Sequence, residues 1–280
     1  MEALSLLWLV PVGAATGFAA GLLGIGGGML LVPFLSMLLP LQGVPATHVV
    51  KVAIATSLTT ILFTSLSSVR GHHRRGAVRW DAVRRLAPGI VAGSAAGAQI
   101  AGLLAGPMLA LVFAGFVSLM ATQMLRARRA PASGGATSAS APVEEAERLP
   151  GAPAMIGMGG LIGAISALVG AGGGFLTVPF LSSRGLTMQQ TVATSAACGF
   201  PIALAGALGY VYSGWHLDLG PGMAGYVHLP ALLVISATSM VTAQFGVRSA
   251  HALPTATLRR IFAILLYSLA GYMLWHGLHA

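Results

Sequence analysis

Gly24-Ile25-Gly26-Gly27-Gly28-Met29-Leu30-Leu31-Val32-Pro33-Phe34-Leu35 is the stretch that decides the fold of this chain. The pattern returns 146 positions later (170 minus 24) as Gly170-Ala171-Gly172-Gly173-Gly174-Phe175-Leu176-Thr177-Val178-Pro179-Phe180-Leu181. Each copy places consecutive glycines, which destabilise a helix, inside an apolar segment that could otherwise cross a membrane. Interrupted apolar segments at corresponding places in two halves of a chain indicate the binding site of a secondary transporter.

The composition is that of a membrane protein. Apolar residues make up 56% of the 280 positions and charged residues 8%, and the mean hydropathy is +0.84. A soluble domain carries about a quarter charged residues, so most of this surface is expected to face lipid. The net charge of +9 comes from basic clusters between apolar runs, which is typical of positive-inside loops and not of a nucleic-acid-binding face. The single cysteine, Cys198, excludes a disulfide scaffold.

Apolar length predicts the helices. A helix needs about 20 apolar residues to span a bilayer, and six stretches satisfy this requirement: 49–69, 86–104, 107–125, 187–210, 229–247 and 257–276. Two longer segments, 6–39 and 154–183, contain the glycine strings and predict helices broken near the middle. We therefore predict an all-α polytopic membrane protein with two homologous halves. Each half has about four membrane helices, of which the first is broken at a glycine cluster.

The predicted halves are residues 1–129 and 154–280, joined by a flexible polar linker, 130–153. The linker is rich in Pro, Ser, Gly and Ala and cannot bury much apolar area. Further matches occur in the same order in both halves: Ala55-Thr56-Ser57 with Ala193-Thr194-Ser195, Ala98-Gln99 with Ala243-Gln244, and Pro107 with Pro254. This conserved order supports an internal duplication.

The arginines predict how the halves are oriented. The chain has 15 Lys and Arg residues, and Lys51 is the only lysine, which leaves 14 arginines. If each broken segment crossed the membrane once, Arg184, Arg248, Arg259 and Arg260 would lie outside the cell. If each broken segment enters and returns, the second half is inverted and all the arginines lie on one side. The positive-inside rule favours inverted repeats, with the arginine-rich loops and the linker cytoplasmic and both termini outside.

The glycine strings are the predicted binding site. A helix that resumes after a break presents free N–H groups and the positive end of its dipole, and in lipid these groups must find a partner or line a cavity. Two such ends facing one cavity favour a compact oxyanion. The predicted substrate-binding residues are those of the strings and the polar residues recurring near them: Gly24, Gly26, Gly27, Gly28, Met29, Gly170, Gly172, Gly173, Gly174, Phe175, Thr56, Ser57, Thr194, Ser195, Gln99 and Gln244. The hydroxyls can instead bond to carbonyls of their own helix, and the glutamines can form helix–helix contacts.

Several functions are disfavoured. The chain has six acidic residues: Glu2, Asp81, Glu144, Glu145, Glu147 and Asp218. None of them is expected in mid-membrane, so neither a carboxylate relay nor a cationic substrate is expected. No hydrolase or metal-binding signature is present in the sequence. We therefore expect that the protein is not an enzyme and that it uses no metal or cofactor. Glycines at four-residue spacing, such as Gly13, Gly17 and Gly21, or Gly93 and Gly97, are predicted to pack helices closely.

The doubled Gly-x-Gly-Gly-Gly…Val-Pro-Phe-Leu, each followed by Ala-Thr-Ser, resembles the TauE/SafE family of bacterial sulfite or organosulfonate exporters and related permeases. The resemblance covers nearly the whole chain and implies an inner-membrane transporter of a small sulfur-containing anion, such as sulfite or sulfoacetate. It extends directly to the glycines of the strings, whereas the roles of the threonine, serine and glutamine pairs follow from position alone. We expect alternating access with substrate near the midplane; the alternatives are an anion channel or facilitator and a non-transporting scaffold. The anion, the direction of transport, the coupling ion and the oligomeric state stay open.

Overall fold

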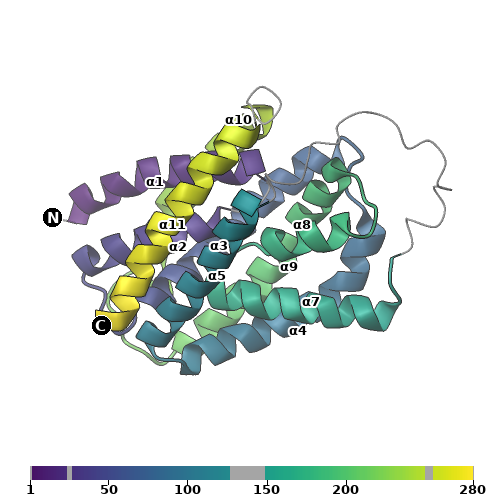
Figure 1. The fold of residues 1–280 in the computed structure, drawn as a ribbon. Coiled ribbons are helices and arrows are strands. Elements are labelled where there is room, and N and C mark those ends of the chain that lie inside the picture. The colour runs from purple at the N-terminus through teal and green to yellow at the C-terminus, as the bar shows by residue number, and fades with distance from the viewer. Residues whose placement is uncertain (1, 24–26, 127–148, 250–254, 280) are drawn as a thin grey trace, which may run out of the picture.

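The computed structural model describes residues 2–23, 27–126, 149–249 and 255–279 (Figure 1). Within these ranges the chain forms ten α-helices, a short 3-10 helix and a β-hairpin of two strands with two residues each. The prediction of an all-α chain is confirmed. Most of the predicted linker, residues 130–148, lies outside the described residues.

The long helices fall where apolar length places them. The six predicted stretches lie in α3 (Val49–His73), α4 (Trp80–Leu103), α5 (Gly106–Arg126), α9 (Met188–Gly214), α10 (Leu229–Ser249) and α11 (Thr255–His279). Within the described ranges, six helices are long and apolar enough to cross a membrane: α3, α4, α5, α7 (Ala152–Val169), α9 and α10.

Each glycine string separates a long helix from a short one. The first lies between α1 (Glu2–Leu23) and α2 (Gly28–Leu38), which runs into the 3-10 helix η1 (Leu39–Gln42). The second lies between α7 and α8 (Gly174–Ser182). At 1.5 Å per residue, α2 is only about 16 Å long and α8 about 14 Å, so neither can span a hydrocarbon core of about 30 Å.

Positive backbone φ angles explain why glycine precedes both short helices. Gly27 has φ 63° and Gly173 has φ 72°, and each is the residue immediately before the first turn of α2 or α8. Gly170 has φ 70° and ends α7. Residues with a side chain rarely adopt this left-handed conformation, whereas glycine does so at little cost.

Small residues pack α1 against α10. A Cβ added at Gly13 would collide with the Thr238 hydroxyl and lie 3.1 Å from the Cα of Ile235. One at Gly17 or Gly21 would collide with the α10 backbone at Ser239 or Ala243. The residue numbers rise together, so the two helices run in the same direction. The predicted packing role of these glycines is confirmed.

Small residues also pack α4 against α7, and these two helices likewise run in the same direction. A Cβ at Gly93 would collide with the backbone of Gly160, and one at Gly97 would lie 2.9 Å from the Cα of Ala164. Figure 1 shows α7 lying along α4 and α11 lying along α5. In addition, α3 packs against α9, α2 against α3, and α8 against α9.

The bundle has two distinct ends. At the hairpin end, the Lys51 ammonium at the start of α3 donates to the carbonyl of Gly102 at the end of α4, at 2.7 Å. The last turn of α11 and the antiparallel pair β1 (Met223–Ala224) and β2 (Val227–His228) lie at this end too, since Gly277 packs against Pro107 and Tyr226 against the His48 ring.

The other end, called the arginine end, contains the turn from Arg70 to Arg79, between α3 and α4, and the start of α9. The Arg79 N–H donates to the hydroxyl of Thr194 at 3.1 Å, which joins the beginnings of α4 and α9. Since α5 and α10 begin at the hairpin end and α11 finishes there, their arginine-bearing termini point toward the arginine end.

Candidate functional site

The two glycine strings meet at Ser57 of α3. The Ser57 hydroxyl lies 3.0 Å from the carbonyl oxygen of Gly170 and 3.4 Å from that of Gly28. A Cβ added at Gly28 would collide with the Gly170 carbonyl, so the two backbones touch with no side chain between them. Ser57 is fully buried and thus holds the strings together inside the bundle.

A small cavity of about 30 Å³ lies beside this contact. It is enclosed by α1, α3, α9 and α10 and by Gly172 of the second string, and its polar side chains are Thr64, Ser65, Ser68 and Ser195. Ser195 is seven positions into α9, about 10 Å along the helix from its start at the arginine end. The cavity therefore lies between the two ends and extends along α3 to Ser68, toward the arginine end.

A second hollow of about 10 Å³ adjoins the cavity and reaches the first string. Gly27 lines it together with Thr16, Thr60 and Ser239, and it shares Ala20 and Thr64 with the cavity. We call the two hollows together the central site. The central site extends from the residue before α2 to the string before α8, so both interrupted helices contribute backbone to it.

Ser195 is the distinctive side chain of the central site. Its hydroxyl is buried, with 1% of the residue exposed, and has no hydrogen-bond partner among the described residues. By contrast, the hydroxyls of Thr64 and Ser65 bond to the Ile61 and Leu62 carbonyls at 3.2 and 3.1 Å. A buried hydroxyl without a partner destabilises a protein by about 1–3 kcal/mol, so Ser195 is a donor available to something else.

The central site is smaller than a sulfur oxyanion. A water molecule needs about 10–15 Å³ of such space, so the cavity of about 30 Å³ would hold roughly two waters. An anion with three oxygens around a central atom does not fit without movement of the surrounding helices. The central site as described is therefore too small for such an anion.

The predicted glycines divide into three groups. Gly27 and Gly172 line the central site, and Gly28 and Gly170 form the contact between the strings. Gly173, Gly174 and Met29 are buried in the adjoining turns, and Phe175 is half-buried. Gly24 and Gly26 lie outside the described residues.

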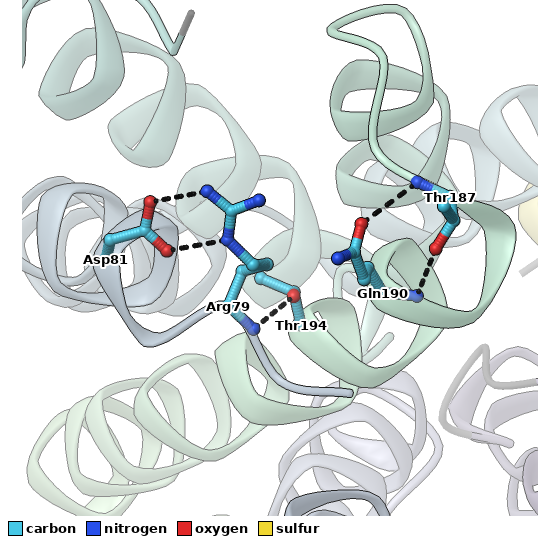
Figure 2. A network of polar contacts seen from close by, with 5 residues as sticks. All are labelled: Arg79, Asp81, Thr187, Gln190 and Thr194. Atoms are coloured by element: carbon cyan, nitrogen blue, oxygen red, sulfur yellow. Dashed lines mark hydrogen bonds and ion pairs between the residues drawn. The ribbon is translucent and has the colours of Figure 1, made fainter. Parts of the chain in front are cut away.

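The two predicted threonines bond to backbone of the opposite half. Thr56 accepts a hydrogen bond from the His228 N–H at 3.0 Å, and Thr194 accepts one from the Arg79 N–H at 3.1 Å (Figure 2). His228 and Arg79 are the residues that precede α10 and α4. Neither threonine lines the central site, so their hydroxyls join helices.

Figure 2 also shows what fixes the surroundings of Thr194. The Arg79 guanidinium pairs with Asp81 at 3.0 Å, and Thr187 and Gln190 form a reciprocal capping box at the start of α9. The box satisfies N–H groups that the first turn of α9 would otherwise leave free. The start of α9 is thereby fixed, and Ser195 lies two turns further along.

The glutamines do not line the central site. Gln99 is exposed; its amide donates to the Gly209 carbonyl at 3.3 Å and accepts from Ser213 at 3.1 Å. This is the helix–helix alternative, between α4 and α9. Gln244 is exposed on α10. The structure brings together the strings and the two serines, and leaves both glutamines outside.

Sequence reasoning missed the hydroxyls of α3 that line the central site: Thr60, Thr64, Ser65 and Ser68. The signal was available, because residues 56–68 contain eight serines and threonines in 13 positions. Such a density within a membrane-spanning helix indicates a polar cavity rather than lipid contact.

The hairpin end contains an open cavity of about 500 Å³, lined among others by Gln42 and His228. Burial lowers the pKa of His228, and its ring nitrogen Nδ1 accepts the Ala231 N–H at 3.1 Å, which caps α10. Burial and the nearby Lys51 charge lower the pKa of His48. Both histidines are therefore harder to protonate than an ordinary histidine side chain.

Known proteins similar to this chain are described as probable membrane transporter proteins. A family model described as sulfite exporter TauE/SafE matches residues 9–273. A probable membrane transporter protein of Haemophilus influenzae is 37% identical over 266 residues, which cover 95% of this chain and 96% of that protein. A probable membrane transporter protein of Methanocaldococcus jannaschii is 25% identical, and the match covers 95% of this chain and 92% of that protein. YunE of Bacillus subtilis, also described as a probable membrane transporter protein, is 28% identical, and the match covers 78% of this chain and 85% of YunE. No solved structure matches the chain significantly. This chain therefore belongs to the sulfite exporter TauE/SafE family of membrane transporters.

Proposed function

We propose that this protein is a secondary carrier that moves a small sulfur-containing anion, such as sulfite, sulfoacetate or a related organosulfonate, across the bacterial inner membrane. The observation that carries the proposal is the buried Ser195 hydroxyl, which has no hydrogen-bond partner among the described residues and lines a small cavity beside Gly172. The printed name of the family, a sulfite exporter, supports the choice of sulfur anions.

The chemistry of the central site favours an anion. Its lining offers hydroxyl groups and glycine backbone, and the described residues contribute no carboxylate to it. The starts of α2 and α8 lie next to Gly27 and Gly172, and free N–H groups at a helix start attract negative charge. A cation would find no counter-charge in this lining.

Inverted repeats are the proposed arrangement of the halves. The contacts of α1 with α10 and of α4 with α7 are exchanged when the two halves are exchanged. The same exchange turns the Thr56–His228 hydrogen bond into the Thr194–Arg79 hydrogen bond. These equivalences support an approximate two-fold axis in the membrane plane, with the arginine end cytoplasmic.

Alternating access is the proposed mechanism. The small central volume favours a carrier over a channel, because an open pore would leave a continuous path. The Thr194–Arg79 bond lies toward the arginine end and the Thr56–His228 bond toward the hairpin end. Opening one end while the other stays closed would widen the central site for an anion.

Counterflow in proteoliposomes tests the function. Vesicles loaded with unlabelled sulfite should accumulate labelled sulfite transiently, and uptake should saturate. Ser195→Ala should abolish most of this uptake, whereas the matched control Ser268→Ala, an exposed serine that bonds within α11, should leave it unchanged. Flux without saturation or counterflow would favour the channel, and normal uptake by Ser195→Ala would refute the site.

Labelling of single cysteines tests the orientation. In a Cys198→Ser background, a cysteine at Ser138 of the linker and another at Ala280 should react from opposite faces of the membrane. Reaction from the same face would contradict the inverted arrangement.

A further inference from the structure

We infer that the central site accepts singly charged oxyanions and rejects doubly charged ones. It then carries hydrogensulfite and alkanesulfonates, but not the sulfite or sulfate dianions, and of the anions proposed above it excludes sulfoacetate, whose sulfonate and carboxylate are both ionised. The inference rests on the proposed function and specifies the charge state of its substrate.

The described residues that line the central site include no ionisable side chain. The residues around it are glycine, alanine, leucine, isoleucine, serine and threonine. Sites that hold a dianion generally pair it with arginine or lysine, whose charge remains when water is removed. Here the anion meets only hydroxyl groups and backbone.

Ionisable groups on the helices around the site lie elsewhere. Among the described side chains of α1, α2, α3, α8, α9 and α10 they are Lys51, Arg70, His72, His73, Cys198, Tyr210 and Tyr212. Lys51 lies at the hairpin end, bonded to Gly102, and the Tyr210 hydroxyl donates to the Ala167 carbonyl at 3.0 Å. Arg70 and His73 are exposed at the arginine end, and Tyr212 is exposed near the end of α9.

His72 is the ionisable group on the same face of α3 as the lining residues. It is half-buried and lies four positions, or about one turn, beyond Ser68. Arg70 lies two positions beyond Ser68 and points to a different face of the helix. His72 is thus one turn outside the central site, toward the arginine end.

The positive potential of the site then comes from two helix starts. Each helix N-terminus is equivalent to about half of an elementary charge, so α2 and α8 together supply about one. The buried Ser195 hydroxyl adds a hydrogen-bond donor but no net charge. One negative charge is therefore compensated, and a second negative charge would be left uncompensated in a site with little room for water.

The pH dependence of sulfite uptake tests the inference. Hydrogensulfite loses its remaining proton near neutral pH, whereas methanesulfonate is a single anion throughout this range. At constant total sulfite, counterflow should fall by about tenfold per pH unit above the midpoint of that ionisation, in parallel with the hydrogensulfite fraction. Methanesulfonate counterflow in the same vesicles should stay constant, and flux into protein-free vesicles is subtracted from both.

The methanesulfonate measurement and a His72→Gln variant separate titration of the substrate from titration of the protein. Titration of a group in the protein would alter the uptake of both anions. The pH dependence of sulfite uptake should be the same in His72→Gln as in the unaltered protein. Sulfate in tenfold excess should leave methanesulfonate uptake unchanged. Sulfite uptake that is constant or rises with pH, or effective competition by sulfate, overturns the inference while leaving the carrier function in place. Absence of counterflow with every anion overturns the carrier function, and the inference with it.

An added charge should reverse the preference. Ser68 lies at the edge of the central site toward the arginine end, and Ser68→Lys would add the missing positive charge. Sulfate should then compete at least tenfold more strongly than in Ser68→Met, which matches the size of the change without its charge. Equal competition in the two variants contradicts an electrostatic origin of the selectivity.

Discussion

Ser57 and Ser195 occupy equivalent positions in the two halves, and the same substitution should have opposite effects on them. The Ser57 hydroxyl has one proton, which lies between the carbonyls of Gly170 and Gly28. Ser57→Ala therefore removes one hydrogen bond between helices. Such bonds in membrane proteins contribute about 0.6 kcal/mol on average and up to about 1.7 kcal/mol. Because the Gly170 carbonyl would stay buried without this donor, we expect the free energy of unfolding to fall by about 1–2 kcal/mol.

Ser195→Ala removes a hydroxyl that has no partner among the described residues. The free energy of unfolding should be unchanged or slightly higher, since an unsatisfied polar group disappears. Substrate affinity should fall instead. A hydrogen bond to a charged group contributes about 1.5–3 kcal/mol, which corresponds to an affinity about 10- to 150-fold weaker.

The assay measures unfolding in detergent and sulfite counterflow for both variants. Ser57→Ala should unfold more easily and still show uptake by the fraction that is folded. Ser195→Ala should unfold normally and lose uptake. If Ser195→Ala loses as much stability as Ser57→Ala and its folded fraction transports normally, the Ser195 hydroxyl is a structural group and the assignment of the site is wrong.

Three further predictions follow from individual contacts. Gly28→Ala should lower the free energy of unfolding by about 1–3 kcal/mol, because the new methyl group meets the backbone of the second string. The control Gly115→Ala has open space around the new methyl group and should raise the free energy of unfolding by up to about 1 kcal/mol in the same denaturation assay. Burial holds the pKa of His228 below its ordinary 6.5, so the unfolded chain binds the proton more readily and unfolding should become easier as pH falls below 6.5. The His228→Asn variant keeps an acceptor that caps α10 and should show a weaker pH dependence of the melting temperature, measured at several pH values. Gln99→Ala should lower the melting temperature of the purified protein while Gln244→Ala does not, and equal melting temperatures would show that the α4–α9 bonds contribute nothing.

Most of the helical architecture could be predicted from the sequence because it depends on local properties. Apolar length located the long helices, and the glycine clusters marked the places where α1 and α7 end. The packing of Gly13 and Gly17 followed from their four-residue spacing, although their partner helix did not. Spacing along one helix shows which face is small, but not what covers it.

The candidate site was harder to predict because its polar groups depend on distant partners. Thr56 and Thr194 recur symmetrically, yet their hydroxyls bond to N–H groups more than a hundred positions away in the sequence. The search for recurring residues also missed Thr64 and Ser68, since the central site is asymmetric. Within it, α3 provides several hydroxyls, whereas the only hydroxyl from α9 is that of Ser195.

The packing of α1 against α10 has a consequence for how the protein is made. Gly13 meets its partner Ile235 only after 222 further residues (235 minus 13) have been added to the chain. At roughly 5–20 residues per second, this takes about 10–45 s, during which the small-residue face of α1 lies uncovered in lipid. Although α1 is synthesised before α2 to α10, it is therefore among the last of these helices to find its place, and a chain truncated before α10 should leave α1 available to protein quality control.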